Sequence, residues 1–330
     1  MTVCFSEPNI PPSFNPKPHK LGNKNYQILD SIRQLFKSKN AQNSNLSKAN
    51  LPNADLRGVN LSGANLEQAN LEGANLVNAN LRNANLKKAN LKNAKLSGCD
   101  LRGADLSFAV LSGSNLTQAN LENSDLKLAN LGCFSSQQTQ LNRANLKNSN
   151  LAQANLQGVC LQGANLTGAN LKQANLNPYL EENNGSTAPI VSDLTGVNLT
   201  NANLLKAQLN GIILENAICE NANFKQAQLQ QAILRNANLM NADLSETDLK
   251  FADLNRANLR GVNFRTSNLE SACLAEANLI NAKLEYARLI EVDLSEANLK
   301  GANWSRAELY NNVMENVTLP DGTKYHQPTS

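Results

Sequence analysis

Aromatic residues and histidines are scarce in this chain of 330 residues. Phe, Trp and Tyr make up 4% of it, which is too little for the mixed core of an ordinary globular domain of this length. The two histidines, His19 and His326, lie near the two ends, and no GxSxG, P-loop, GxGxxG or HExxH motif is present. We therefore expect no catalytic, cofactor-binding or metal-binding residues, and we expect that the protein is not an enzyme.

Long apolar runs and paired cysteines are also lacking. No segment approaches the ~20 consecutive apolar residues of a transmembrane helix, and the first residues, with Pro8, Pro11 and Pro12, do not resemble a signal peptide. The six cysteines are scattered without a CxxC motif, as is typical of reduced thiols that pack as small apolar groups. These absences predict a cytoplasmic protein that does not bind membranes.

Strong charge of one sign is missing as well. The net charge of +3 does not predict nucleic-acid binding. The charge is nevertheless uneven: residues 1–44 carry +4, 45–176 carry +5, 177–193 carry −3, 194–319 carry −3, and 320–330 carry none. The first half of the chain is therefore mildly basic and the second half mildly acidic.

Leucine recurs every five residues through most of the sequence. One register runs from Leu46 to Leu176 and a second from Leu194 to Leu319, which gives 53 central positions, 47 of them Leu. The residue two positions earlier is small, usually Ala, and the residue just before the leucine is usually Asn or Asp. The other six central positions hold Ser136, Cys219, Phe224, Phe264, Trp304 and Met314.

A period of five fits neither a helix nor a flat strand. Five residues rotate an α-helix by about 140°, and an odd spacing sends side chains to opposite faces of a strand, so the leucines would not share one buried side. A backbone that turns after every repeat can point every leucine inward. Thirteen of the 17 glycines lie two residues after the central position, where a type II turn requires positive φ. Four such turns, one after each repeat, close a square coil, and the repeats predict about 13 coils.

The repeats resemble the pentapeptide-repeat family, whose consensus is A(D/N)Lxx. Ala64 to Gln68 reads Ala-Asn-Leu-Glu-Gln, and Ala74 to Asn78 reads Ala-Asn-Leu-Val-Asn. The resemblance implies an all-β solenoid, a right-handed quadrilateral parallel β-helix. It also implies a non-enzymatic structural or protein-interaction scaffold with a possible regulatory role. The ending from Leu319 to Gly322 resembles a tail of cyanobacterial members.

The resemblance also offers an alternative function. Some family members imitate B-form DNA and bind type II topoisomerases. Such mimicry needs a strongly negative surface, whereas the repeats of this chain sum to +2. The charge therefore disfavours a DNA-mimic role, although loops that leave the coil matter in those relatives and this chain has one.

Two segments outside the two registers each allow two interpretations. Residues 24–38 form an amphipathic pattern, either a helix that caps the first coil or a basic helix for a partner or a membrane. The loop between the registers has about 13 extra residues and is either a contact site or a tolerated bulge between blocks. Residues 132–140 predict a distorted corner. The expected organisation is a Pro-rich segment with a capping helix (1–44), a first block (45–176), an inserted loop (177–193), a second block (194–319) and a tail (320–330).

Several residues are candidates for contacts with a partner, which we expect to be an unidentified protein. Phe108 and Leu128 occupy the same position of repeats that lie one coil apart, so they should stack near Val110, and Ile213 with Ile233 should stack likewise. The open last coil predicts a possible homodimer through the C-terminal end. The candidate contacts are Tyr179, Leu180, Glu181, Glu182 and Ile190 in the loop, and Phe108, Leu128, Ile290 and Tyr310 on the coils.

Overall fold

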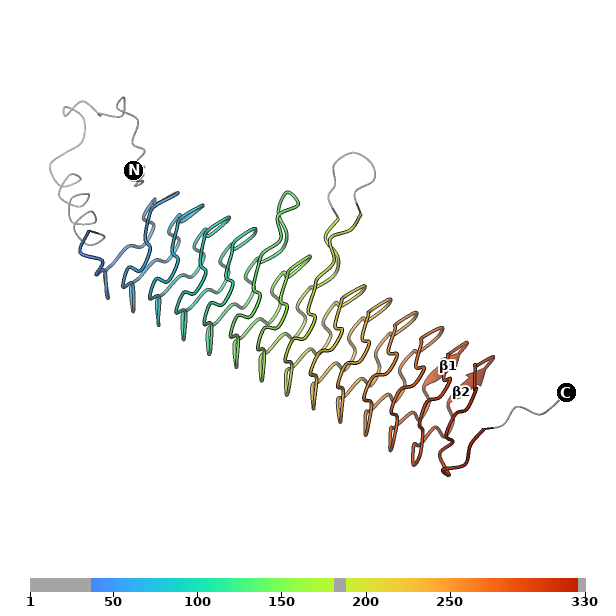
Figure 1. The fold of residues 1–330 in the computed structure, drawn as a ribbon. Helices are drawn as coiled ribbons and strands as arrows, with labels where there is room; N and C mark the ends of the chain where they lie inside the picture. Colours follow the sequence, from blue (N-terminus) through green and yellow to red (C-terminus); the bar gives the residue numbers. More distant parts are fainter. Residues whose placement is uncertain (1–36, 181–187, 326–330) are drawn as a thin grey trace, which may run out of the picture.

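The computed structural model describes residues 37–180 and 188–325, and the chain winds into a long rod of stacked coils (Figure 1). Parallel bridges join equivalent positions of successive coils, such as Asn65 and Asn85. Before the last coil, the backbone N–H of a central leucine donates to the next coil, as from Leu66 N to Asn85 O at 2.7 Å. A coil of four repeats and the solenoid fold are thus as the repeat spacing predicts.

Leucine and alanine fill the interior of the rod. Leu61, Ala64 and Leu66 are each 0% exposed, and equivalent residues form one continuous core along both blocks. A small residue beside each leucine is required because a narrow coil has no room for two large side chains on one side. Phe224 and Phe264 replace leucine in the core and are also fully buried.

A tight turn follows most central residues, but not Leu131 and Leu176, which lead into the two insertions. Ala49 N donates to Leu46 O at 3.0 Å, and Lys48, the residue before Ala49, has a φ of 57°. Positive φ at the third residue alone is the mark of a type II turn, for which Gly and Asn are best suited. All 13 glycines of the repeats at this position have positive φ, as expected from the sequence.

The straight sides between turns are so short that few of them count as strands. Two strands are present in the described residues: β1 spans Arg288–Ile290 and pairs in parallel with β2, Glu308–Tyr310. Ile290 pairs with Tyr310, and an isolated bridge joins Ile213 and Ile233. The predicted stacking of these two pairs is therefore confirmed.

Residues 132–140 differ from the prediction. The spacing of bridges rises from 20 to 25 between Asn115 and Gln140, because five extra residues leave the coil. Phe134 and Gln137 pair in antiparallel fashion across Ser135 and Ser136, which both have positive φ, as in the turn of a β-hairpin. The prediction of a distorted corner is thus wrong. We call residues 133–139 the hairpin; Ser136, its exposed tip, is not a core position.

The inserted loop leaves the rod in the same way. Cys160 pairs with Asp193 across the loop, so the bridge spans a full coil and the extra loop segment together. Tyr179 and Ile190 form an antiparallel bridge at the base of the loop, with N–H···O distances of 2.8 and 3.0 Å. The hairpin (green) and the base of the loop (yellow-green) project from the same edge of the rod (Figure 1).

The described part of the tail, residues 320–325, lies against the last coil of the described rod. Leu319 N donates to Thr323 O and Tyr325 N donates to Val317 O, both at 2.8 Å, so the tail folds back along one side. Leu309, a central leucine of this coil, is 45% exposed. At the other end, residues 24–36 of the expected helix lie outside the described ranges. Among residues 37–180 and 188–325, no helix is long and apolar enough to cross a membrane.

Candidate interaction surfaces

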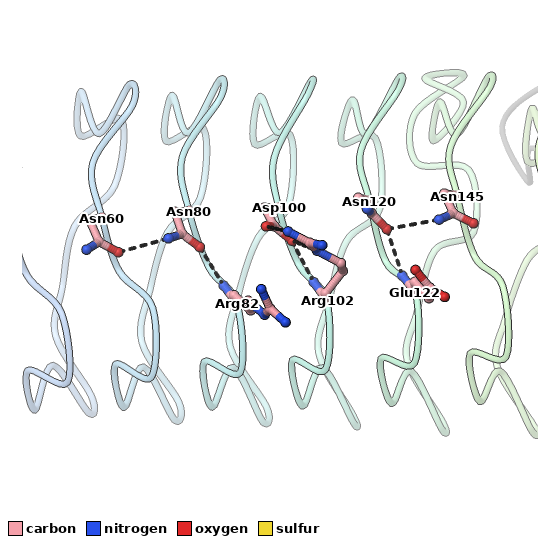
Figure 2. Close-up of polar contacts among 8 residues, drawn as sticks. All are labelled: Asn60, Asn80, Arg82, Asp100, Arg102, Asn120, Glu122 and Asn145. Atoms are coloured by element: carbon pink, nitrogen blue, oxygen red, sulfur yellow. Dashed lines mark hydrogen bonds and ion pairs between the residues drawn. The ribbon is translucent and has the colours of Figure 1, made fainter.

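Asparagine side chains form rows on the outside of the rod (Figure 2). Asn80 Nδ2 donates to Asn60 Oδ1 at 3.1 Å, and Asn145 Nδ2 donates to Asn120 Oδ1 at 3.1 Å. Asn80 Oδ1 also accepts a hydrogen bond from the backbone N–H of Arg82 at 3.1 Å. One carboxamide thus joins two coils and closes its own turn, which explains why Asn so often precedes the central leucine.

Asp100 interrupts one of these rows (Figure 2). An ionised carboxylate has no N–H, so it cannot donate to Asn80 as an asparagine would. It accepts instead from Arg102, at 2.8 Å from the guanidinium Nε and 3.2 Å from the backbone N. The hydrogen bond with Arg102 holds the pKa of Asp100 below its ordinary value. An ion pair within one coil has replaced a hydrogen bond between coils.

Ion pairs join neighbouring coils in the second block. Arg256 donates twice to Glu276 at 2.9 Å, while Lys250 and Arg288 approach Glu270 to 3.0 and 3.1 Å. The cations lower the pKa of both glutamates, Arg256 that of Glu276 and mainly Lys250 that of Glu270. In each pair the two partners belong to successive coils. Sequence reasoning missed these pairs, although opposite charges at the coil spacing are a signal that could have revealed them.

The hairpin and the inserted loop share one glycine. Gly158 belongs to the coil between them and has a φ of +64°. A Cβ atom at Gly158 would lie 3.1 Å from Ile190 O, 3.1 Å from Tyr179 Cβ and 3.2 Å from Cys133 Cβ. Both insertions therefore pack against the same point of the rod. We call the hairpin, the described base of the loop and Gly158 together the insertion corner.

The insertion corner presents apolar groups on a fixed base. The hairpin folds back over an earlier coil, where Gly113 N donates to Thr139 Oγ1 at 3.0 Å. Lys92 Nζ lies 3.4 Å from the ring centroid of Phe134, which is 39% exposed. Leu180, the last described residue before the gap in the loop, is 68% exposed. This arrangement suits a protein contact better than a reaction.

The structure brings the predicted contact residues together only in part. Phe108 and Leu128 are half-exposed at equivalent turns of successive coils, as expected. Ile290 and Tyr310 pair near the C-terminal end, and Tyr310 is largely exposed. These positions lie apart from the insertion corner along the chain. Tyr179, Leu180 and Ile190 belong to the corner, whereas Glu181 and Glu182 fall outside the described residues.

Two of the described cysteines, Cys99 and Cys219, are small core residues. Cys99 and Cys219 are buried, and burial raises the pKa of each thiol to about 12. Such thiols are protonated at neutral pH and are poor nucleophiles. Between residues 37 and 325, apart from 181–187, no group of three or more His, Cys, Asp or Glu side chains is placed to hold a metal ion.

The repeats match the family model of pentapeptide repeats in eight copies. The matched stretches are 40–73, 64–103, 104–132, 137–177, 192–227, 222–261, 248–285 and 287–321. They cover most of the chain and include both blocks.

Among solved structures, the chain is similar to three proteins with related repeats. HetL, a pentapeptide repeat protein involved in heterocyst differentiation regulation from the cyanobacterium Nostoc sp. Strain PCC 7120, is 30% identical over 72% of this chain and 91% of HetL, with a TM-score of 0.31. Rfr23 from the cyanobacterium Cyanothece 51142 is 30% identical over 47% of this chain and 90% of Rfr23, with a TM-score of 0.23.

The third is QnrB1, a plasmid-mediated fluoroquinolone resistance protein. A trypsin-treated form of it is 16% identical over 61% of this chain and 89% of QnrB1, with a TM-score of 0.27. A search of curated proteins gave no match. The repeat match, which extends over both blocks, leads to one conclusion: the chain belongs to the pentapeptide-repeat family.

Proposed function

We propose that this pentapeptide-repeat protein is a non-enzymatic scaffold that binds a protein partner through its insertion corner. The observation that carries the proposal is the packing of both insertions against Gly158. Two segments that leave a regular solenoid independently have no structural need to meet, and exposed loops on a rigid support are common contact sites. The proposed setting is the cytoplasm, where thiols stay reduced.

The finer description of the fold belongs to the same proposal. In this proposal a right-handed coil is repeated about 13 times. A long rigid rod then holds the insertion corner at a fixed distance from both ends. Such a spacer fits a structural or regulatory scaffold.

The insertion corner can be removed without changing the coil. Deleting residues 134–138 leaves Leu131 and Thr139 at the spacing of an ordinary repeat. Deleting residues 179–191 and replacing Pro178 with Gly does the same for the loop, because Gly tolerates the positive φ that Pro cannot adopt. Thr139 and Ser192 are each 0% exposed and already fill the small inward position. We call this double deletion the cornerless variant.

The test compares partners captured from host cells by the parent, the cornerless variant and a control, Phe251→Asn. Phe251 is exposed on a turn of the second block. We expect the cornerless variant alone to lose the partner while its circular dichroism stays that of a β-helix. Retention of every partner by a folded cornerless variant would overturn the proposal. Inhibition of gyrase supercoiling by micromolar parent protein would instead favour the topoisomerase alternative.

A homodimer through the last coil is a further part of the proposal. Leu309 and Val313 are 45% and 51% exposed there, and the described residues of the tail bond to Val317 and Leu319. Burying such groups between two copies removes apolar surface and an open strand edge from water. Sedimentation equilibrium should show a dimer for the parent and a monomer for Leu309→Glu. A monomeric parent at its highest soluble concentration would contradict this part alone.

A further inference from the structure

Four bulky side chains occupy a backbone conformation that disfavours them. Phe108, Leu128, Phe251 and Tyr286 all lie at turn positions with φ between 58° and 60°, and each is 39–56% exposed. In this left-handed region the Cβ atom crowds the backbone, so glycine or asparagine is preferred. Each of the four also leaves apolar surface in water. A residue that is unfavourable in the fold on two counts points to a role outside the fold.

Two of these side chains have a partner within the rod. Lys250 Nζ lies 5.8 Å from the ring centroid of Phe251, and the Arg306 guanidinium lies 5.4 Å from that of Tyr286. These cations cover the rings and give the aromatic groups a structural use. Neither Phe108 nor Leu128 contacts a cation in this way within the described ranges. They are the pair whose presence the rod itself does not explain.

Phe108 and Leu128 are neighbours in space. Phe108 N donates to Lys127 O at 3.0 Å, so the two turns lie in adjacent coils at strand spacing. Val110 follows on the same coil, at a place in its row where the coils before and after have Asn90 and Asn130. A valine there breaks the row of carboxamides and extends the apolar surface. We call Phe108, Val110 and Leu128 the apolar stripe.

Lysines without carboxylate partners border the apolar stripe. Lys87 and Lys88 occupy the equivalent turn one coil earlier, and Lys127 precedes Leu128. In the described parts of the chain none of the three forms an ion pair, whereas the second block pairs many of its cations. Asp105 and Asp125 lie on the same side, but they accept the backbone N–H groups of Ser107 and Lys127, each at 2.9 Å.

We propose that the apolar stripe docks an acidic polypeptide segment that carries an apolar side chain. The apolar group would cover Phe108 and Leu128, and the flanking carboxylates would pair with the lysines. A second copy of the same stripe is disfavoured because lysines would face lysines. Nucleic acid, whose bases could stack on Phe108, is the alternative that the test below distinguishes. The proposal rests on the protein-interaction function but uses a surface other than the insertion corner.

The test uses fluorescein-labelled synthetic peptides and the full chain. The probe peptide alternates Glu with Leu and Phe; one control replaces Glu by Lys, and the other replaces Leu and Phe by Ser. Fluorescence anisotropy should show binding of the probe alone, weakened by salt. The double variant F108N/L128N should bind at least about tenfold more weakly, and Phe251→Asn, a matched change in the second block, should bind as the parent does.

A second measurement separates lost contact from lost folding. Asn is well suited to the left-handed turn, so F108N/L128N should unfold at a temperature at least as high as the parent does. Equal affinity of parent and F108N/L128N for the probe, or equal affinity for the Lys peptide, would overturn the proposal. Preferential binding of an oligonucleotide of ~12 nucleotides that is lost in F108N/L128N would overturn it in favour of nucleic acid.

The cornerless variant distinguishes failure of this inference from failure of the proposed function. It should bind the probe peptide as the parent does, because the apolar stripe is intact. If the parent captures a partner through its insertion corner but does not bind the probe, only the stripe proposal fails. If the parent binds the probe through the stripe but cornerless capture is unchanged, only the role of the corner fails.

Discussion

The two repeat blocks share one core but hold their neighbouring coils together by different side chains. In residues 45–176, rows of asparagine join the coils, and the two ion pairs, Asp55 with Arg57 and Asp100 with Arg102, stay within one coil. In residues 194–319, asparagine rows are accompanied by seven ion pairs, and all seven cross from coil to coil. Both blocks keep the leucine interior, so the difference is confined to the surface.

This difference separates charged side chains that pair within the rod from charged side chains that are available to a partner. Six of the eleven Lys and Arg residues of the second block pair with a glutamate or aspartate of the adjacent coil. The first block binds its coils with neutral groups, which leaves lysines such as Lys87 and Lys127 without partners. Both insertions and the apolar stripe also belong to, or border, the first block. We infer that the first block carries recognition and the second block mainly extends the rod.

The largest expected effect comes from Gly158 at the insertion corner, compared with Gly196 in the second block. Both have a φ near +64°, but a Cβ at Gly196 meets nothing within 4 Å. Gly196→Ala should cost about 1 kcal/mol from backbone strain alone. Gly158→Ala should cost about 1–3 kcal/mol more because Cβ contacts both insertions. Urea unfolding of the two variants measures the difference, and equal losses would show that the insertions do not pack on Gly158.

The core and the turns that the two blocks share could be predicted from the sequence, whereas the hairpin and its contact with the loop could not. The positions of leucine and glycine predicted the interior and the turns because both follow from one period. The hairpin stayed hidden because its insertion adds one whole repeat length, so Ser136 kept the place of a central residue while leaving the coil. The contact of Gly158 with Tyr179 stayed hidden because the path of a loop is not encoded by periodicity. The two turn residues of the apolar stripe were visible in the sequence as exposed apolar groups, but that Phe251 and Tyr286 have a cation partner, whereas these two have none in the described ranges, appears only in the structure.

Acid should affect the second block more than the first. Hydrogen bonds from Lys225, Arg256 and Arg265 lower the folded-state pKa of Glu246, Glu276 and Glu285 below 4.5, the ordinary value. A lowered folded-state pKa contributes stability that is complete above the unfolded-state pKa and is lost as pH falls through the folded-state value. We therefore expect hydrogen-exchange protection to fall further in residues 194–319 below pH 4.5.

The first block is the internal control for this acid effect. Asp55 and Asp100 also have lowered pKa values, each mainly through an arginine two residues away. That arginine stays nearby in the unfolded chain, so less stability depends on the folded state. Protection should be corrected for the intrinsic pH dependence of exchange. Equal losses in the two blocks would show that pairs between coils matter no more than local ones.

A single glutamate should show the same contrast on a smaller scale. Glu270→Gln removes the carboxylate that Lys250 and Arg288 share, whereas Glu67→Gln in the first block removes one that has no ion pair in the described structure. We expect Glu270→Gln to lower the midpoint of thermal unfolding more than Glu67→Gln does. The gap should narrow in high salt because these groups are partly exposed. A gap independent of salt would indicate lost packing instead of lost charge pairing.

The smallest expected effect is also the most direct test of how rows and ion pairs substitute for one another. Asp100→Asn supplies the N–H that the row in Figure 2 lacks, so a hydrogen bond to Asn80 worth about 0.5–1.5 kcal/mol becomes available. It also ends the ion pair with Arg102, which salt weakens. The two changes oppose each other at low salt, and only the ion pair fades as salt rises. The midpoint of thermal unfolding of Asp100→Asn should therefore lie close to that of the parent at low salt.

At high salt the midpoint of the variant should rise relative to that of the parent, because the parent loses its ion pair while the restored row keeps its hydrogen bond. A variant that stays level with the parent or falls below it at high salt would show that the row adds nothing. The expected gain would show that, in the first block, a row of neutral carboxamides can replace an ion pair without loss of stability.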